Sequence, residues 1–540
     1  MSNNNKNIEL HFITNSESVY LWEHEMIQAI LSLSGVSEVS FLVLDDVTTS
    51  SSIPPLVTLA YALDKPLASC QTESQSIKSI RTFAGSRIKK ISPDNLSDTT
   101  FLESNFESKT TNYQIIVNLT ESLLPDPIYS LVNTHVLSMF FSRLMVIKSE
   151  LIGLLEFTDK RKVINTGIQL ETESSEKNVV IYEAEHSLES ASLCRTLETI
   201  LHKTSLFMPH VLDKFSHYYE DSLTKTNYLD VESSLSKTLS FKEQLRFFTK
   251  FSTRVISRFW YKLTAGEQWI MMLAKNDEAS KPNFAFEHFH RIMPPKSEFW
   301  ADPFLFEHEN KHFLFFEVFP FKRDLGHLSC MEINEDGTFG EVVKILERPY
   351  HFSYPNVFEF EDKVFMVPET GGCERIELYE AKSFPYEWEL KHHLMEGIRA
   401  YDSTFIEHNG IWWMFANVAE TEKCATNEEL HLFYSDSPIS QNWKPHPANP
   451  INTFASSSRP AGKIYKEDGK LFRPSQDCAG SYGAAINICE IVTLNKDTYE
   501  EKIISKRKPD WDKSLIGLHT LNFDSKYSVI DVILDRGFLK

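Results

Sequence analysis

The pattern of hydrophobic and polar positions changes twice along the 540 residues of the chain. Up to about residue 210, short apolar runs rich in β-branched residues alternate with amphipathic stretches at helical spacing. The runs at 8–14, 39–46, 113–120 and 177–185 predict strands, and the stretches at 22–35 and 188–215 predict helices. Strands that alternate with helices predict an α/β domain with a parallel or mixed sheet.

The middle of the chain has a different pattern. Residues 216–240 are polar and poor in large aliphatic side chains, which is typical of a linker. The segment 241–263 (FKEQLRFFTKFSTRVISRFWYKL) is basic and aromatic and has the period of a helix. Two interpretations stay open for it: a connecting helix that packs on a domain, or a helix that makes peripheral contact with a membrane surface.

From about residue 266 the chain is rich in Phe, Trp, Tyr and turns, and it repeats. Each copy has a polar opening, an apolar strand, a turn such as EDK, HNG or EDG, and a second apolar strand. The openings are 52, 48, 57 and 60 residues apart, at Asp302, Tyr354, Asp402, Arg459 and His519. This period predicts a five-bladed β-propeller, with a β-sandwich or a β-solenoid as the alternative. EQWIMML (267–273) is expected to close the ring against the last blade.

The sequence therefore divides into an α/β domain (1–215), a helical linker (216–265) and a propeller (266–540). The net charge of −20 makes nucleic acid an improbable partner and favours neutral ligands such as sugars. The N-terminus lacks a basic region followed by an apolar run, so we expect a cytoplasmic protein. Seven scattered cysteines without CxxC spacing predict neither a zinc site nor a disulfide framework, and no motif indicates a cofactor.

The repeat openings are the strongest candidates for a functional site. The innermost strand of each propeller blade lines the axial channel, so the five opening side chains are expected to meet in one polar funnel. The alternative is that they satisfy turns and strand ends, for which Asp before Pro is common. Trp300 and Tyr354 lie beside openings, where aromatic rings stack on sugar faces.

The motif WADPFLFEHENKHFLFFE (300–317) resembles the first blade of the five-bladed propellers of glycoside hydrolase family 43. The resemblance implies that Asp302 is the general base. It also implies that Asp402 tunes and orients the catalytic partner, and that His519 is the fifth-blade histidine at the pocket floor.

This sequence departs from that family at the fourth blade, where Arg459 stands in place of the general acid Glu. Arginine cannot donate a proton at useful pH, so Glu369 and Asp477 are the candidate acids. Arginine also suits an anionic group on a sugar. We therefore expect Arg459, Arg473 and Asp477 to bind substrate together with His519, Tyr354 and Trp300.

A second resemblance covers almost the whole chain. The series WADPFLFEH, ERPYHFSYP, PET, SRPAG and FRPSQDC, behind an α/β domain, resembles the N-terminal portion of plant glucosamine inositolphosphorylceramide transferases and their stand-alone bacterial relatives. The front domain resembles the formyltransferase fold. Phenylalanines of LSMFF (137–141) occupy its Asn-x-His element, and Glu171 stands where that family has a histidine. The resemblance thus implies a degenerate formyltransferase-like domain.

Together these features predict a bacterial, carbohydrate-active enzyme that acts on a glycosidic bond. The expected setting is biosynthesis or remodelling of a surface polysaccharide or glycolipid. Asp302, Asp402 and Glu369 are the expected catalytic residues. Two alternatives stay open: a non-catalytic glycan-binding or assembly protein, and a sugar-modifying transferase (glycosyl or formyl) that uses the front domain.

Overall fold

The computed structural model separates the chain into two compact units, residues 1–255 and residues 256–540. None of the helices it describes is both long enough and apolar enough to cross a bilayer. The described residues are 8–44, 54–68, 73–74, 76–83, 86–106, 113–120, 122, 124–131, 133–142, 152–159, 161–172, 177–188, 192–215, 218–219, 228–230, 240–264 and 267–536.

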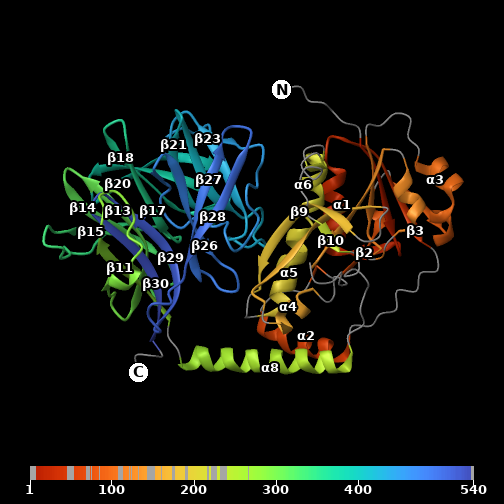
Figure 1. The fold of residues 1–540 in the computed structure, drawn as a ribbon, viewed down its shortest axis with the longest axis horizontal. Coiled ribbons are helices and arrows are strands. Elements are labelled where there is room, and N and C mark those ends of the chain that lie inside the picture. Colours follow the sequence, from red (N-terminus) through yellow and green to blue (C-terminus); the bar gives the residue numbers. More distant parts are fainter. Residues whose placement is uncertain are drawn as a thin grey trace. The chain divides into compact units, whose positions relative to one another are not determined.

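The first unit contains an eight-stranded mixed sheet (Figure 1). Its core strand β1 (Ile8–Thr14) pairs in parallel with its two neighbours β3 and β6, and almost all its side chains are buried. Such burial on both faces is what a central parallel strand requires. The sheet order is β10 (Tyr228–Asp230), β9 (Lys177–Ser187), β8 (Val163–Glu171), β7 (Thr134–Phe140), β6 (Tyr113–Asn118), β1, β3 (Val36–Leu44) and β5 (Arg87–Ile91).

Helices pack on this sheet and on one another. Their bounds are α1 (Leu21–Leu31), α2 (Pro55–Ala68), α3 (Thr99–Phe106), α4 (Leu154–Thr158), α5 (Leu193–Thr204), α6 (Phe207–Asp213) and α8 (Phe241–Thr264). Ile27 and Ile30 of α1 and Phe207 of α6 share one buried cluster with the strands. The expected α/β class is confirmed, whereas the formyltransferase resemblance stays a prediction.

Two details differ from the sequence interpretation. The stretch 188–215, expected as one helix, forms α5 and α6, separated at Ser205 and Leu206. The expected linker contributes β10, which pairs with the edge of β9. Most of the remaining linker, 216–239, lies outside the described residues, which include only 218–219 and 228–230 of it.

The second unit contains five four-stranded antiparallel sheets, which confirms the five-bladed propeller. The first three blades are β13 (Glu298–His308) to β16 (Val343–Leu346), β17 (Ser353–Phe360) to β20 (Glu387–Glu396), and β21 (Ala400–His408) to β24 (Lys444–Pro445). The fourth runs from β25 (Tyr465–Glu467) through β26 (Lys470–Asp477) and β27 (Ala485–Leu494) to β28 (Tyr499–Arg507).

The fifth blade joins the two ends of the unit. Its inner strands β29 (Leu515–Phe523) and β30 (Tyr527–Asp535) come last in the chain, while β11 (Glu267–Lys275) and β12 (His290–Ile292) come first. β11 pairs with β30 over nine residues. The expected closure of the ring by the segment at 267–273 is therefore confirmed.

The first hairpin of each of the first four blades uses a two-residue turn with positive φ at both positions. The φ values are +51° and +63° at Glu309 and Asn310 in the first blade, and +56° and +75° at Asn409 and Gly410 in the third. Such turns match the twist of paired strands. The turns recognised in the sequence as EDK, HNG and EDG therefore set the register of the inner strands; those of the first three blades carry the openings Asp302, Tyr354 and Asp402.

Candidate active site

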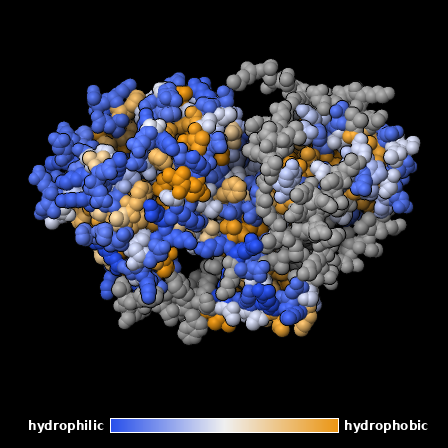
Figure 2. Space-filling model, in the orientation of Figure 1, coloured by the Kyte–Doolittle hydropathy of each residue, from blue (hydrophilic) through white to orange (hydrophobic). Residues whose placement is uncertain are grey.

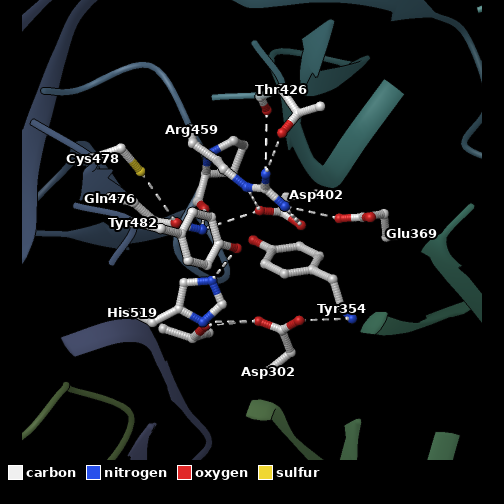
Figure 3. A network of polar contacts seen from close by, with 12 residues as sticks. Asp302, Tyr354, Glu369, Asp402, Thr426, Arg459, Gln476, Cys478, Tyr482 and His519 are labelled. Atoms are coloured by element: carbon white, nitrogen blue, oxygen red, sulfur yellow. Dashed lines mark hydrogen bonds and ion pairs between the residues drawn. The ribbon is translucent and has the colours of Figure 1, made fainter. Parts of the chain in front are cut away.

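The opening residues of the propeller lie at irregularities of the inner strands. Strand pairing shifts between Ala301 and Phe304, and equivalent shifts occur in the second, third and fifth blades. Asp302, Tyr354 and Asp402 have φ values of +51°, +46° and +52°. This left-handed conformation is strained for residues with a β-carbon. A bulge re-aims its side chain, and here the bulges direct side chains from different blades toward one another (Figure 3).

Asp302 and His519 form one half of this cluster, together with Asp531 of β30. His519 Nδ1 lies 3.0 Å from Asp531 Oδ2 and 3.3 Å from Asp302 Oδ1. Asp531 also accepts hydrogen bonds from the backbone amides of Asp302 (2.8 Å) and Thr520 (2.6 Å). Asp531 thus holds the first and fifth blade openings together, and it leaves the Asp302 carboxyl facing the axis.

Asp402 and Arg459 form the other half, with Glu369 from the second blade. Arg459 Nε donates to Asp402 Oδ2 at 2.6 Å, and Nη2 donates to Glu369 Oε2 at 3.0 Å and to Asp402 Oδ1 at 3.3 Å. Nη1 donates to the carbonyl and hydroxyl oxygens of Thr426. All five N–H groups of the guanidinium are therefore engaged within the protein. The expected binding of an anionic substrate group by Arg459 stays a prediction, and it would require such a group to replace one of these protein partners.

Tyr354 connects these two halves below the openings. Its backbone amide donates to Asp302 Oδ2 at 3.2 Å, and its hydroxyl contacts Thr404 Oγ1 at 2.8 Å and accepts from the Gly462 amide at 2.7 Å. The side chain is fully buried. The hydrogen bonds of Tyr354 therefore connect its own blade to three others. The expected stacking of its ring on a sugar does not fit the burial of the side chain.

The accessible rim carries other aromatic rings. Tyr482, in the loop between β26 and β27, is 41% exposed, and its hydroxyl lies 2.7 Å from His519 Nε2. Its ring and that of Tyr401 lie over the Arg459 guanidinium at 5.0 Å and 5.7 Å. Trp269 packs against His519, with ring centroids 4.8 Å apart. These rings are better placed than Tyr354 to contact a sugar.

Burial and mutual repulsion change the protonation of the carboxyls. Burial raises the pKa of Asp302 to about 7; the charge of His519 opposes this rise, while Asp402 and Asp531 reinforce it. Burial and Asp402 raise the pKa of Glu369 well above its usual range. Burial lowers the pKa of His519, but Asp531 and Asp302 outweigh it and bring the value to about 9. Near neutral pH, these shifts favour an imidazolium at His519, place Asp302 close to its midpoint and favour the acid form of Glu369 over its carboxylate.

Among the described residues, one trio offers three ligand atoms within 4.8 Å of one another and could hold a metal ion. This trio is Asp302, His519 and Asp531. Ligation by His519 would require a neutral imidazole, so a metal would have to displace the proton that the two carboxylates favour on this ring. Without a metal, the contacts of the trio fix the orientation of His519.

Three residues expected in the site lie outside the cluster. Arg473 is buried within the fourth blade, where it donates to both carboxylate oxygens of Glu501 and to the Ser457 carbonyl. The Trp300 ring is buried in a hydrophobic cluster with Phe316 and donates to Glu298. Asp477 caps the amide of Ala479 and pairs with Lys506. Their contacts give all three structural roles, so the expected substrate binding does not fit.

Sequence reasoning missed Glu317, Gln476 and Asp531. Glu317 lies in the second strand of the first blade, 15 residues after Asp302, as Glu369 follows Tyr354 by 15 in the second blade. A glutamate that recurs at this spacing after an opening was the signal that could have found Glu317. Gln476 donates to Asp402 Oδ2 at 3.1 Å. Nothing in the local sequence distinguishes it from other strand residues.

The front domain holds a smaller buried polar network. The Glu171 carboxylate accepts hydrogen bonds from Asn118 (3.1 Å) and from the Tyr129 hydroxyl (2.8 Å). Burial raises the pKa of Glu171. His135 packs among the rings of Tyr113, Phe215 and Tyr219. The network satisfies its own members, so it offers no clear binding group for a donor molecule.

Known proteins resemble the propeller segment. Residues 286–518 match the family model described as "Glucosamine inositolphosphorylceramide transferase 1, N-terminal". The protein named glucosamine inositolphosphorylceramide transferase 1 is 35% identical over 208 residues in Oryza sativa subsp. japonica and 31% over 242 residues in Arabidopsis thaliana. These matches cover 38% and 43% of this chain, but only 28% and 31% of the relatives. The resemblance noted in the sequence motifs is thus confirmed for the propeller.

Solved structures that match part of this chain do so at lower identity. A family 117 glycoside hydrolase of Zobellia galactanivorans has 11% identity and a TM-score of 0.33, and covers 49% of this chain and 90% of its own. The arabinanase Arb43A of Bacillus subtilis has 11% identity and a TM-score of 0.31, with 44% and 93% covered.

Proposed function

We propose that the propeller is a carbohydrate-active enzyme that breaks or transfers a glycosidic bond during synthesis or remodelling of a glycolipid. The observation that carries this proposal is the convergence of buried carboxyl groups from three blades, Asp302, Glu369 and Asp402, at the axis. Glycoside chemistry needs one carboxylate and one carboxylic acid around the scissile bond. Burial raises the pKa of Asp302 to about 7 and that of Glu369 well above its usual range, which is consistent with a base and an acid among them. The names of the plant relatives support a glycolipid setting over a polysaccharide.

The remaining residues of the cluster orient these groups. Asp402 and Arg459 form a buried ion pair that fixes the wall opposite Asp302. The imidazolium of His519 holds Asp302 in place and opposes a further rise of its pKa. The site offers carboxyl acceptors and no spare guanidinium donor, which fits the hydroxyl groups of a sugar better than a phosphate or carboxylate.

Turnover of glycosides tests this proposal. The wild-type protein would be assayed against a panel of aryl glycosides and glycosylated inositol phospholipids. Asp302→Asn is expected to lower kcat/KM by about 10²- to 10⁴-fold with little change in thermal midpoint. Glu335→Gln, on an exposed turn of the same blade, is the matched control. Equal activity of Asp302→Asn and wild type would reject the assignment of the base.

A glycan-binding module is the second candidate. Its support is Arg459, which occupies the place where the resembled hydrolases carry their acid and is fully engaged by the protein. In that case the wild type binds sugars without turning them over, and Asp302→Asn keeps most of the affinity. Calorimetric titration beside the turnover assay separates the two candidates.

Peripheral membrane contact through α8 is a further part of the proposal. One face of α8 is buried in the first unit through Phe247 and Phe251. A different face leaves Phe241, Leu245 and Ile256 exposed by 70%, 51% and 57%. Figure 2 shows hydrophobic and hydrophilic residues side by side on the described part of this helix, at the bottom of the view. Lys242 and Arg246 are the exposed basic residues of the described part of this helix, whereas Lys250 donates to the Thr158 carbonyl and Arg254 lies over the Phe157 ring. Exposed apolar side chains on the same helix as two exposed basic residues suit an anionic lipid surface.

A further inference from the structure

The axial cluster contains more acids than its cations can neutralise. Five buried carboxyl groups face two cations, Arg459 and His519. The five are Asp302, Glu317, Glu369, Asp402 and Asp531. Both cations are already committed: Arg459 to Asp402 and Glu369, and His519 to Asp531 and Asp302. The carboxyl group without a share in either cation is Glu317.

Glu317 is also the one of these five carboxyl groups that makes no hydrogen bond to a described residue. Among the described residues, none donates to either of its carboxyl oxygens, although the residue is only 4% exposed. His351 Nε2 lies 3.4 Å from Oε1, but burial and the charge of Arg459 lower the pKa of His351 and favour its neutral form. A β-carbon placed on Gly326 would lie 2.4 Å from Oε1, so the glycine makes room for this carboxyl group.

The environment of Glu317 favours a carboxylic acid over a carboxylate. Burial, and after it repulsion from Asp302, Glu369, Asp531 and Asp402, raises the pKa of Glu317 well above its usual range. The strand register places Glu317 near the axial acids, because its backbone pairs with Ala301, directly before Asp302.

The pKa of Glu369 is raised as well, but its carboxyl group is occupied. Arg459 donates to Oε2 at 3.0 Å, and the same guanidinium donates to Asp402. This clamp holds the Glu369 carboxyl against Arg459. A general acid must present its proton to the leaving oxygen at hydrogen-bonding distance. The Glu317 carboxyl group makes no hydrogen bond within the described protein, so it remains available for this role.

We propose that Glu317 is the proton donor of the axial site and that Glu369 belongs to the Arg459 clamp. This assignment rests on the proposed glycosidic chemistry. The proton of the Glu317 carboxyl moves to the glycosidic oxygen as the bond from that oxygen to the anomeric carbon breaks. A water or acceptor hydroxyl forms the new bond to the anomeric carbon, and its proton passes to Asp302. Glu317 ends as a carboxylate and Asp302 as an acid, and exchange with solvent restores both.

Leaving-group dependence tests this role. Matched dinitrophenyl and methyl glycosides of the sugar that the wild type accepts would be compared, because a dinitrophenolate leaves without protonation and a methoxide does not. Glu317→Gln is expected to lower kcat/KM by about 10²- to 10⁴-fold on the methyl glycoside and by less than about tenfold on the dinitrophenyl glycoside. The alkaline limb of the pH profile on the methyl glycoside should disappear in this variant. Glu317→Asp, which keeps the acid, should retain the alkaline limb.

Glu369→Gln is the matched comparison, with an expected loss that is similar on both substrates. A loss in Glu317→Gln that does not depend on the leaving group, or no loss, overturns the assignment. Leaving-group dependence in Glu369→Gln overturns it as well, because the donor is then Glu369. If the wild type turns over no glycoside, the proposed function itself fails and the assignment fails with it. Thermal midpoints of all variants show whether the fold is kept.

Discussion

Replacement of Arg459 by methionine tests the buried clamp most directly. Arg459 is the centre of five hydrogen bonds, and its partners Asp402 and Glu369 are buried. Methionine fills similar space but provides no donor, so the Asp402 charge remains buried with only Gln476 to donate to Oδ2. Loss of one partner of a buried ion pair typically costs about 3–5 kcal/mol. Since 1 kcal/mol shifts the midpoint of a domain of this size by about 2–4 °C, we expect a fall of about 6–20 °C.

Differential scanning calorimetry of Arg459→Met at two pH values is the assay. The destabilisation should be smaller at about pH 5 than at about pH 8, because a carboxylate left without its cation can be neutralised by a proton. Arg291→Met is the control: it removes an ion pair to Asp512 whose side chains are 31% and 38% exposed, and it should cost less than about 1 kcal/mol. A propeller midpoint of Arg459→Met within about 2 °C of wild type would refute the argument, since the clamp would then contribute little.

Three further predictions follow from the same structure. In wild type, kcat/KM should rise with pH through about 7, because the base Asp302 must lose its proton; a flat pH–rate profile between about pH 6 and 8 would contradict this. Tyr354→Phe should lower the free energy of unfolding in urea by about 1–3 kcal/mol, because it leaves the Gly462 amide unpaired, whereas Tyr386→Phe on the exposed surface should have no measurable effect. Leu245→Glu should reduce co-sedimentation with vesicles of phosphatidylcholine and phosphatidylserine at least about threefold. The control Leu390→Glu, on exposed β20, should not reduce it. Equal vesicle binding of both variants would argue against membrane contact through α8.

Much of the propeller could be predicted from the sequence because its signals are local. Apolar alternation and two-residue turns such as Asn409–Gly410 specify each hairpin within about twenty residues of chain. Repetition of that hairpin at a period near fifty residues predicts the blades, and the unmatched strand at 267–273 predicts closure of the ring. The openings at Asp302, Asp402 and His519 were found for the same reason.

The roles of individual side chains depended on contacts between distant parts of the chain. Arg459 and Arg473 look equally suited to bind a ligand in the sequence, yet one joins the axial clamp and the other pairs with Glu501 inside a blade. Asp531 binds the amide of Asp302, 229 positions away in the chain. Local periodicity indicates which face of a strand a residue occupies. It does not indicate which residues of another blade lie next to it at the axis. Only the closed ring brings those ends together, and their mutual burial then determines which carboxyl groups hold a proton and which hold a cation.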